Sequence, residues 1–162
     1  MLNESSKLRT YRLLKNDYFK EQYLSVNMPG KYKSSFAKIR YEVAPLKIET
    51  GRYEGVSIEN RTCFNNICNV NNGIENENHV LLECPEHADL RYYLFEHACF
   101  YNNNFMQLSD DEKCVFLFSG ENMCFYSAKI YHDILFKRKY FISMNCWLYI
   151  YIVSHNSFKN GS

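Results

Sequence analysis

Residues 63 to 85 read Cys-Phe-Asn-Asn-Ile-Cys-Asn-Val-Asn-Asn-Gly-Ile-Glu-Asn-Glu-Asn-His-Val-Leu-Leu-Glu-Cys-Pro. The polar part of this stretch is long for an irregular connection inside a compact domain, so it needs a structural reason. That reason is a set of four side chains in the spacing C-x4-C-x10-H-x4-C, namely Cys63, Cys68, His79 and Cys84. Three thiolates and one imidazole form the donor set of a structural tetrahedral zinc site, which leaves no coordination position for water. The stretch therefore predicts a zinc-binding loop.

Two alternatives to this ligand set stay open at the level of the sequence. His87 follows Cys84 by three residues and is a competing fourth ligand. Without a metal, Cys63 and Cys68 are loop thiols and Cys84 caps the next helix. The remaining cysteines lie in apolar helical contexts and are interpreted as core thiols, because buried free cysteine behaves as a small apolar side chain. They are Cys99, Cys114, Cys124 and Cys146.

Outward from this loop, the apolar spacing predicts a mainly α fold, a small helical domain around the zinc loop. The predicted helices span residues 7–24, 31–43, 85–101, 110–118 and 121–140, with one helical turn over residues 79–83. Pro45 ends the second helix and leaves a short extended segment near residues 46–49. Ser109 and Glu112 form a capping box that opens the helix ending near Phe118.

On the N-terminal side of the loop, two predicted helices each have an apolar face that we expect to be buried. The first helix presents Leu8, Tyr11, Leu14 and Tyr18 at helical spacing. The second presents Phe36, Ile39 and Val43.

The length of 162 residues fits one ordinary domain, and 46% hydrophobic residues suffice for a packed core. We predict a helical zinc-binding domain over residues 1–140 and an apolar tail over residues 141–162. The stretch from Phe141 to Val153 is shorter than the about 20 residues of a membrane-spanning helix, so no membrane interaction is predicted. It continues the last helix or packs on the core as a strand-like extension.

The charges balance, with 19 Lys and Arg against 18 Asp and Glu and a formal net charge of +1. No global field therefore directs the chain to nucleic acid, and any such binding must be local. The N-terminus shows no secretory signal, and the seven cysteines are an odd number. Both observations favour reduced thiols in the cytoplasm or nucleus and a protein that is not secreted.

Four ordered runs, residues 36–40, 43–54, 60–64 and 75–85, resemble the zinc-binding region that follows the polymerase in non-LTR (LINE-like, jockey-like) retrotransposon reverse transcriptase proteins. The resemblance implies zinc at Cys63, Cys68, His79 and Cys84, and a role beside a polymerase that copies element RNA at a cleaved DNA target. The loop departs from the family, which more usually shows C-x2-C, so Asn65-Asn66 and residues 71–73 resemble insertions.

Catalysis is not predicted for this chain. The paired-aspartate polymerase motif is absent, and Asp110-Asp111 belongs to a helix cap. Gly-rich phosphate loops and the G-x-S-x-G elbow are absent as well. We therefore expect a non-catalytic accessory domain that contacts an RNA or DNA backbone or the polymerase domain of a parent element, without a small-molecule substrate. The alternative is a helical protein-interaction module with a purely structural zinc.

Backbone contacts to nucleic acid require lysines and arginines, which neutralise phosphates without reading sequence. If the leading hypothesis holds, at least four of the basic candidates other than Arg40 share a face near the zinc loop. In the alternative interpretation Lys31 and Lys38 are solubilising charges on an outward face, and Arg40 pairs with Glu42 or Glu49. The candidates are Lys31, Lys33, Lys38, Arg40, Arg52, Arg61, Lys137, Arg138 and Lys139.

Overall fold

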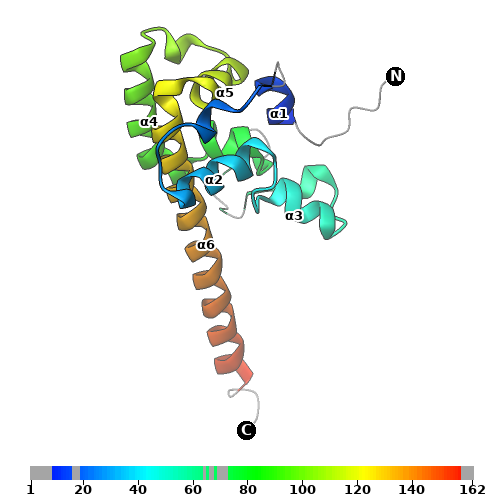
Figure 1. The fold of residues 1–162 in the computed structure, drawn as a ribbon. Coiled ribbons are helices and arrows are strands. Elements are labelled where there is room, and N and C mark those ends of the chain that lie inside the picture. The colour runs from blue at the N-terminus through cyan, green and yellow to red at the C-terminus, as the bar shows by residue number, and fades with distance from the viewer. Residues whose placement is uncertain (1–8, 16–18, 64, 66–67, 69–72, 158–162) are drawn as a thin grey trace, which may run out of the picture.

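The structure is a computed structural model that describes residues 9–15, 19–63, 65, 68 and 73–157. Most of these residues are helical, which confirms the mainly α prediction (Figure 1). Within the described ranges, extended residues pair in a single antiparallel bridge between Thr62 and Ile74. The elements are α1 (Arg9–Leu14), η1 (Gln22–Leu24), α2 (Gly30–Arg40), α3 (Lys47–Tyr53), η2 (Ile58–Asn60), η4 (His79–Glu83), η5 (Pro85–His87), α4 (Ala88–Tyr101), η6 (Phe105–Gln107), α5 (Asp110–Ser119) and α6 (Glu121–Ser157).

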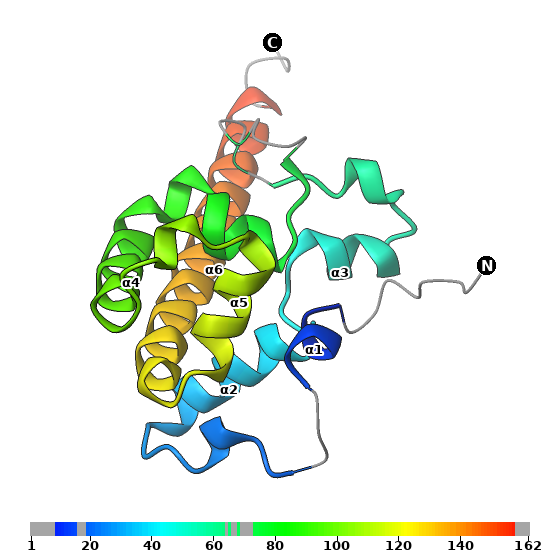
Figure 2. The same cartoon turned by 90° about the horizontal axis from the view of Figure 1, so that it is seen from above.

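The N-terminal half of α6 is the central element, and α2, α4 and α5 pack around it (Figure 2). Three buried rings join these layers: Phe36 from α2, Phe118 from α5 and Tyr131 from α6. Their centroids lie 5.2 Å apart for Phe36 and Phe118 and 4.9 Å apart for Phe118 and Tyr131. Each such buried side chain contributes roughly 1.5–3 kcal/mol, so this cluster fixes how the helices pack around α6.

Helix α6 continues without a break through the predicted boundary near Tyr140 and ends at Ser157. Its C-terminal half extends past the other labelled helices in Figure 1. The predicted continuation of the last helix is therefore present in the backbone of residues 141–157. Across the described residues, no helix combines the length and the apolar character needed to cross a membrane.

The predicted first helix over residues 7–24 is replaced by two shorter elements. α1 ends at Leu14, and η1 begins only at Gln22. The sequence that follows α1 contains Asn16 and Asp17, whose side chains compete with the backbone for hydrogen bonds and disfavour helix interiors. Of the predicted inner face, Leu14 is buried, while Leu8 and Tyr18 lie outside the described residues.

The second predicted helix ends three residues early, because the chain reverses at Glu42. This residue adopts a left-handed conformation with φ of 54°, and its carboxylate accepts a hydrogen bond from the Thr10 backbone amide. Phe36 and Ile39 are fully buried as predicted, but Val43 lies beyond the reversal and is 65% exposed. The assignment of Val43 to the inner face was wrong.

The segment near residues 46–49 is helical rather than extended. Leu46 is the last extended residue, and α3 begins at Lys47. The Glu75 carboxylate accepts a hydrogen bond from the Lys47 amide at 2.6 Å, which satisfies one of the free amides at this helix start. This partner is 28 residues away in the chain, so the local pattern did not reveal the helix.

The C-terminal helices match their sequence signals more closely. Ser109 and Glu112 form the predicted capping box at the start of α5, and Gly120 is its C-terminal cap. Pro85 opens η5, which leads directly into α4. Lys137 and Arg138, near the middle of α6, bond to Glu86 and Glu75, so these two residues lie beside this helix.

Candidate metal centre

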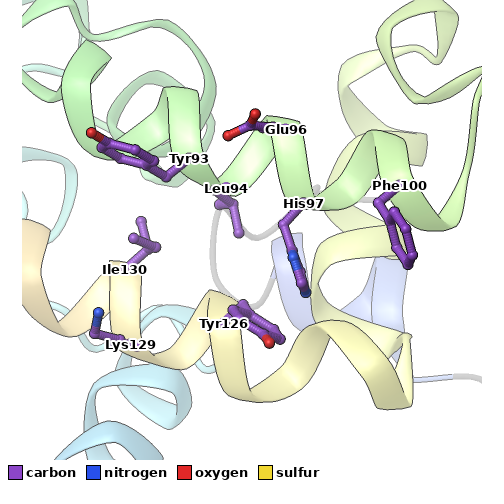
Figure 3. A pocket seen from close by; sticks show the side chains of 8 residues that line it. All are labelled: Tyr93, Leu94, Glu96, His97, Phe100, Tyr126, Lys129 and Ile130. Carbon is purple, nitrogen blue, oxygen red and sulfur yellow. The ribbon is translucent and has the colours of Figure 1, made fainter.

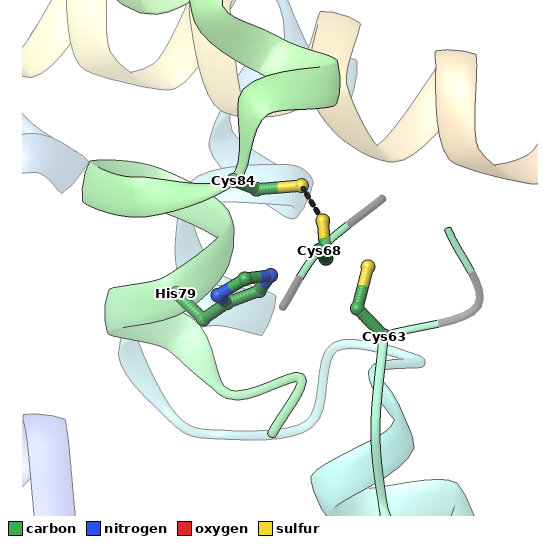
Figure 4. A group of neighbouring side chains, drawn as sticks. All are labelled: Cys63, Cys68, His79 and Cys84. Carbon is green, nitrogen blue, oxygen red and sulfur yellow. Dashed lines mark hydrogen bonds between the residues drawn. The ribbon is translucent and has the colours of Figure 1, made fainter. Parts of the chain in front are cut away.

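Cys63, Cys68, His79 and Cys84 converge on one point, as the spacing predicted. One ligand atom from each side chain lies within 4.8 Å of all the others. Figure 4 shows His79 and Cys84 projecting from the η4 turn toward Cys68 and Cys63. These four side chains could hold a single metal ion.

Backbone contacts hold Cys63 and Cys68 on either side of Gly73. The bridge between Thr62 and Ile74 closes the loop, and the Cys63 amide donates to the Gly73 carbonyl. Gly73 has φ of 63°, and an added Cβ at this position would meet the Cys68 carbonyl oxygen at 2.4 Å. Glycine is therefore required at this close approach, which sets the position of Cys68 relative to Cys63.

A single π-helical turn accounts for the H-x4-C spacing. η4 runs from His79 to Glu83, and the Cys84 amide donates to the His79 carbonyl at 2.7 Å. This i to i+5 hydrogen bond brings both side chains to the same side of the turn. Arg91 in α4 donates to the Cys84 carbonyl at 2.9 Å, and the Asn76 side chain accepts from the His79 amide at 2.8 Å. Both ends of the turn are thereby fixed.

The chemistry of the four donors fits a metal better than a metal-free core. His79 is 2% exposed, yet neither of its ring nitrogens forms a hydrogen bond with a residue that the structure describes. A buried polar group without a partner costs free energy, and coordination removes this cost. The Nδ1 atom lies 3.4 Å from the Glu83 carboxylate, so this carboxylate can orient the ring while Nε2 binds the metal.

The sulfur distances agree with this interpretation. Cys68 Sγ and Cys84 Sγ lie 3.4 Å apart, well beyond the about 2.05 Å of a disulfide. Two Zn–S bonds of about 2.3 Å at a tetrahedral angle place their sulfurs about 3.8 Å apart. All three cysteines are free thiols. The thiols are therefore spaced as ligands and not as a cross-link.

Without a metal, the ligand side chains have pKa values that differ from their ordinary ones. The Cys84 thiol and burial raise the pKa of Cys63 to about 12, and burial is also the main cause that raises the pKa of Cys68. Burial alone would lower the pKa of His79, but the neighbouring Cys63 and Glu83 outweigh it and raise the pKa. A metal must therefore displace thiol protons when it binds, which couples its affinity to pH.

His87, the alternative ligand, is not part of this cluster. It is 2% exposed, and burial, aided by the charges of Lys137 and Arg91, lowers its pKa to about 4. The neutral ring is therefore packed as a structural residue.

Two residues predicted to bind phosphates instead connect α6 to residues beside the metal ligands. Lys137 donates to the Glu86 carbonyl at 2.7 Å, and Arg138 donates two hydrogen bonds to the Glu75 carboxylate at 2.8 and 2.6 Å. Arg138 is 5% exposed and Glu75 is 1% exposed. The charge of Arg138 is therefore paired inside the protein, which explains why a basic residue occurs at this position of α6.

Two further arginines of the predicted set are also engaged internally. Arg40 is buried, forms an ion pair with Glu21 rather than with Glu42 or Glu49, and donates to the Phe118 carbonyl at 3.4 Å. Arg61 donates to the carbonyl groups of Val56 and Ile48 at 2.8 and 2.9 Å.

The remaining basic candidates lie nearer to solvent. Arg52 pairs with Glu49 at 2.9 Å, and Lys33 donates to the Leu24 carbonyl at 3.1 Å. Lys31, Lys38 and Lys139 are exposed. Lys38 and Lys139 line the same groove between α2 and α6.

Sequence reasoning missed Glu75 and Glu83, the two carboxylates that support the centre. Neither belongs to a recognisable motif. Glu75 pairs with residues on α6 and α3, and Glu83 lies near His79, one turn away. A carboxylate four residues after the predicted ligand His79 was the available signal for Glu83, since that spacing brings side chains together on a helical turn.

Comparison with protein-family models, with curated proteins and with solved structures gives no match for this chain. The fold and the four-residue cluster therefore carry the functional argument.

Proposed function

We propose that the chain is a non-catalytic, zinc-stabilised accessory domain that contacts the phosphate backbone of RNA or DNA, in the manner that its resemblance to the C-terminal region of retrotransposon reverse transcriptases implies. Zinc is the metal proposed, because three thiolates and one imidazole match its structural sites. Four protein ligands complete a tetrahedral shell, so the metal has no open position for substrate.

The placement of Lys38 and Lys139 is the observation that carries the nucleic-acid part of this proposal. Lys38 on α2 and Lys139 on α6 line one groove of about 510 Å³, and none of the described residues that line it with them is a carboxylate. Arg138 also lines the groove, but its charge is offset by Glu75. Two lysine charges on facing helices are suited to a phosphate backbone.

Salt-dependent binding tests this function. Labelled RNA and DNA are titrated with the zinc-loaded protein across a series of salt concentrations. Lys38→Glu and Lys139→Glu should weaken binding and reduce the log-log salt slope by about one for each phosphate contact removed. Lys20→Glu changes an exposed lysine outside this groove and is the charge-matched control. Unchanged slopes in the groove variants would refute the proposal.

The protein-interaction alternative is favoured by a different surface. Val43, Pro45 and Tyr53 line a groove between the α2–α3 connection and α3, where Tyr53 is 81% exposed. Exposed apolar surface of this kind marks docking sites for other proteins. A salt-insensitive interaction that Tyr53→Ala abolishes would support this function in place of nucleic-acid binding.

A further inference from the structure

The exposed face of α6 has an unusual composition. In the part of α6 whose side chains are described, residues 122–140, every exposed side chain except Asn122 is aromatic or basic. We call this set the α6 stripe, and it consists of Tyr126, Lys129, Phe136, Lys139 and Tyr140. Exposed aromatic rings cost hydration free energy, so their repeated alternation with lysines suggests a ligand that uses both.

The stripe begins at a groove of about 600 Å³ between α4 and α6. Figure 3 shows His97 extending from α4 toward Tyr126 on α6, and their ring centroids lie 3.5 Å apart. His97 Nε2 is buried and has no hydrogen-bond partner. Tyr93 and Phe100, which are 65% and 79% exposed, form the α4 side, and Lys129 lines the groove from α6.

The other end of the stripe lies in the groove between α2 and α6 described above. Phe136 and Lys139 both line that groove, and Phe136 contacts Tyr140 with a centroid distance of 4.5 Å. Between Tyr126 and Lys139 the helix rises about 20 Å, at about 1.5 Å per residue. A single continuous ligand can therefore contact both grooves.

We propose that the α6 stripe is a track for single-stranded nucleic acid. The bases stack on Tyr126, Phe136 and Tyr140, while Lys129 and Lys139 neutralise the phosphates between them. Aromatic platforms alternating with cations are the general solution for binding single strands, because every base has a π-face. Protein-binding surfaces are instead depleted in lysine, which argues against a protein partner for this face.

The groove at the start of the stripe receives one unstacked base. Its aromatic walls supply stacking surface, and the His97 ring packs behind Tyr126 and supports it. One carboxylate, Glu96, also lines this groove, and a second, Asp133, lies half-buried beside the stripe on α6. Because Asp133 repels phosphates, Asp133→Asn should tighten binding.

This inference rests on the proposed nucleic-acid function and adds the strand type, the track and the role of the bases. The test compares three ligands of equal length with the zinc-loaded full chain: a single strand, the matching duplex, and an abasic single strand that keeps its phosphates. The single strand should bind more tightly than both others. Tyr126→Ala and Phe136→Ala should each weaken single-strand binding by about tenfold or more and leave abasic binding unchanged.

Phe19→Ala is the matched control, because it removes an exposed aromatic ring that lines neither groove of the stripe. Thermal unfolding of each variant verifies that these surface substitutions leave the fold intact. Equal binding of the abasic and base-containing strands would overturn the stacking track while leaving backbone binding, and so the proposed function, in place. Failure of all three ligands to bind would overturn both, and binding that Phe19→Ala weakens as much as Tyr126→Ala would also overturn the track.

Discussion

Arg138 donates two hydrogen bonds to the Glu75 carboxylate in the interior of the protein. The same carboxylate accepts from the Lys47 amide, and the Glu75 carbonyl accepts from the Ile48 amide at 3.0 Å. The buried Glu75 carboxylate therefore connects α6 to the start of α3. Glu75 itself directly follows Ile74, whose bridge to Thr62 lies next to the ligand Cys63.

Removing one partner of this buried pair should destabilise the protein strongly. Arg138→Ala leaves the Glu75 charge buried without its cation, and such losses cost about 3–5 kcal/mol. Denaturant unfolding of the zinc-loaded protein measures the effect. Lys139→Ala, one residue along α6 and exposed, is the control and should change stability by less than about 0.5 kcal/mol. Equal stabilities of the two variants would show that the pair contributes nothing.

Gly73→Ala should weaken metal binding more than it changes the rest of the fold. The substitution places a Cβ at 2.4 Å from the Cys68 carbonyl at a positive φ, so Cys68 must move away from the other ligands. Competition with a chelator of known zinc affinity measures the loss. Gly30→Ala has open space around the added Cβ and should retain the affinity. Unchanged affinity of Gly73→Ala would mean that the loop tolerates a different geometry.

The buried His87 should make stability depend on pH. Its pKa falls from 6.5 in the unfolded chain to about 4 in the folded protein, mainly through burial. As the pH falls, the unfolded state therefore takes up a proton at a higher pH than the folded state does. The contribution of neutral His87 to the free energy of unfolding is fully present above the pKa of the unfolded state and is lost as the pH falls toward the pKa of the folded state. The linked loss is on the order of 3 kcal/mol between about pH 6.5 and pH 4.

Comparison of the wild type with His87→Gln isolates this contribution. Acid also releases the metal from both proteins, so the difference between their pH dependences is the informative quantity. Unfolding free energies measured at several pH values should fall more steeply for the wild type. Parallel curves would show that His87 does not remain neutral in the folded state.

Truncation after Tyr140 tests the C-terminal half of α6. In Figure 1 the backbone of this half extends beyond the other labelled helices, and most helical stability in proteins comes from packing against other elements. The truncated chain should keep its zinc and lose less than about 2 kcal/mol, the scale of burying one large apolar side chain. A larger loss would place residues 141–157 in the core and extend the domain past residue 140.

The sequence was sufficient for features that depend on local chemistry. The mainly α class, the Ser109–Glu112 capping box and the four metal-ligand candidates all follow from side-chain type and spacing. The start of α3 and the pairing of Arg138 were not accessible in this way, because both depend on Glu75, which is distant in the chain. A basic residue on a helix has the same appearance in sequence whether it meets a phosphate or a buried carboxylate.

Metal stoichiometry tests the central claim most directly. The protein is purified without chelator, and zinc per chain is measured by native mass spectrometry and by elemental analysis, for the wild type, Cys84→Ser and Cys99→Ser. Cys99 is a free thiol outside the cluster and is the matched control. We predict one zinc ion per chain in the wild type and in Cys99→Ser, and none in Cys84→Ser. One zinc ion retained by Cys84→Ser, or no metal in the wild type, would contradict the assignment of Cys63, Cys68, His79 and Cys84 as a structural zinc site.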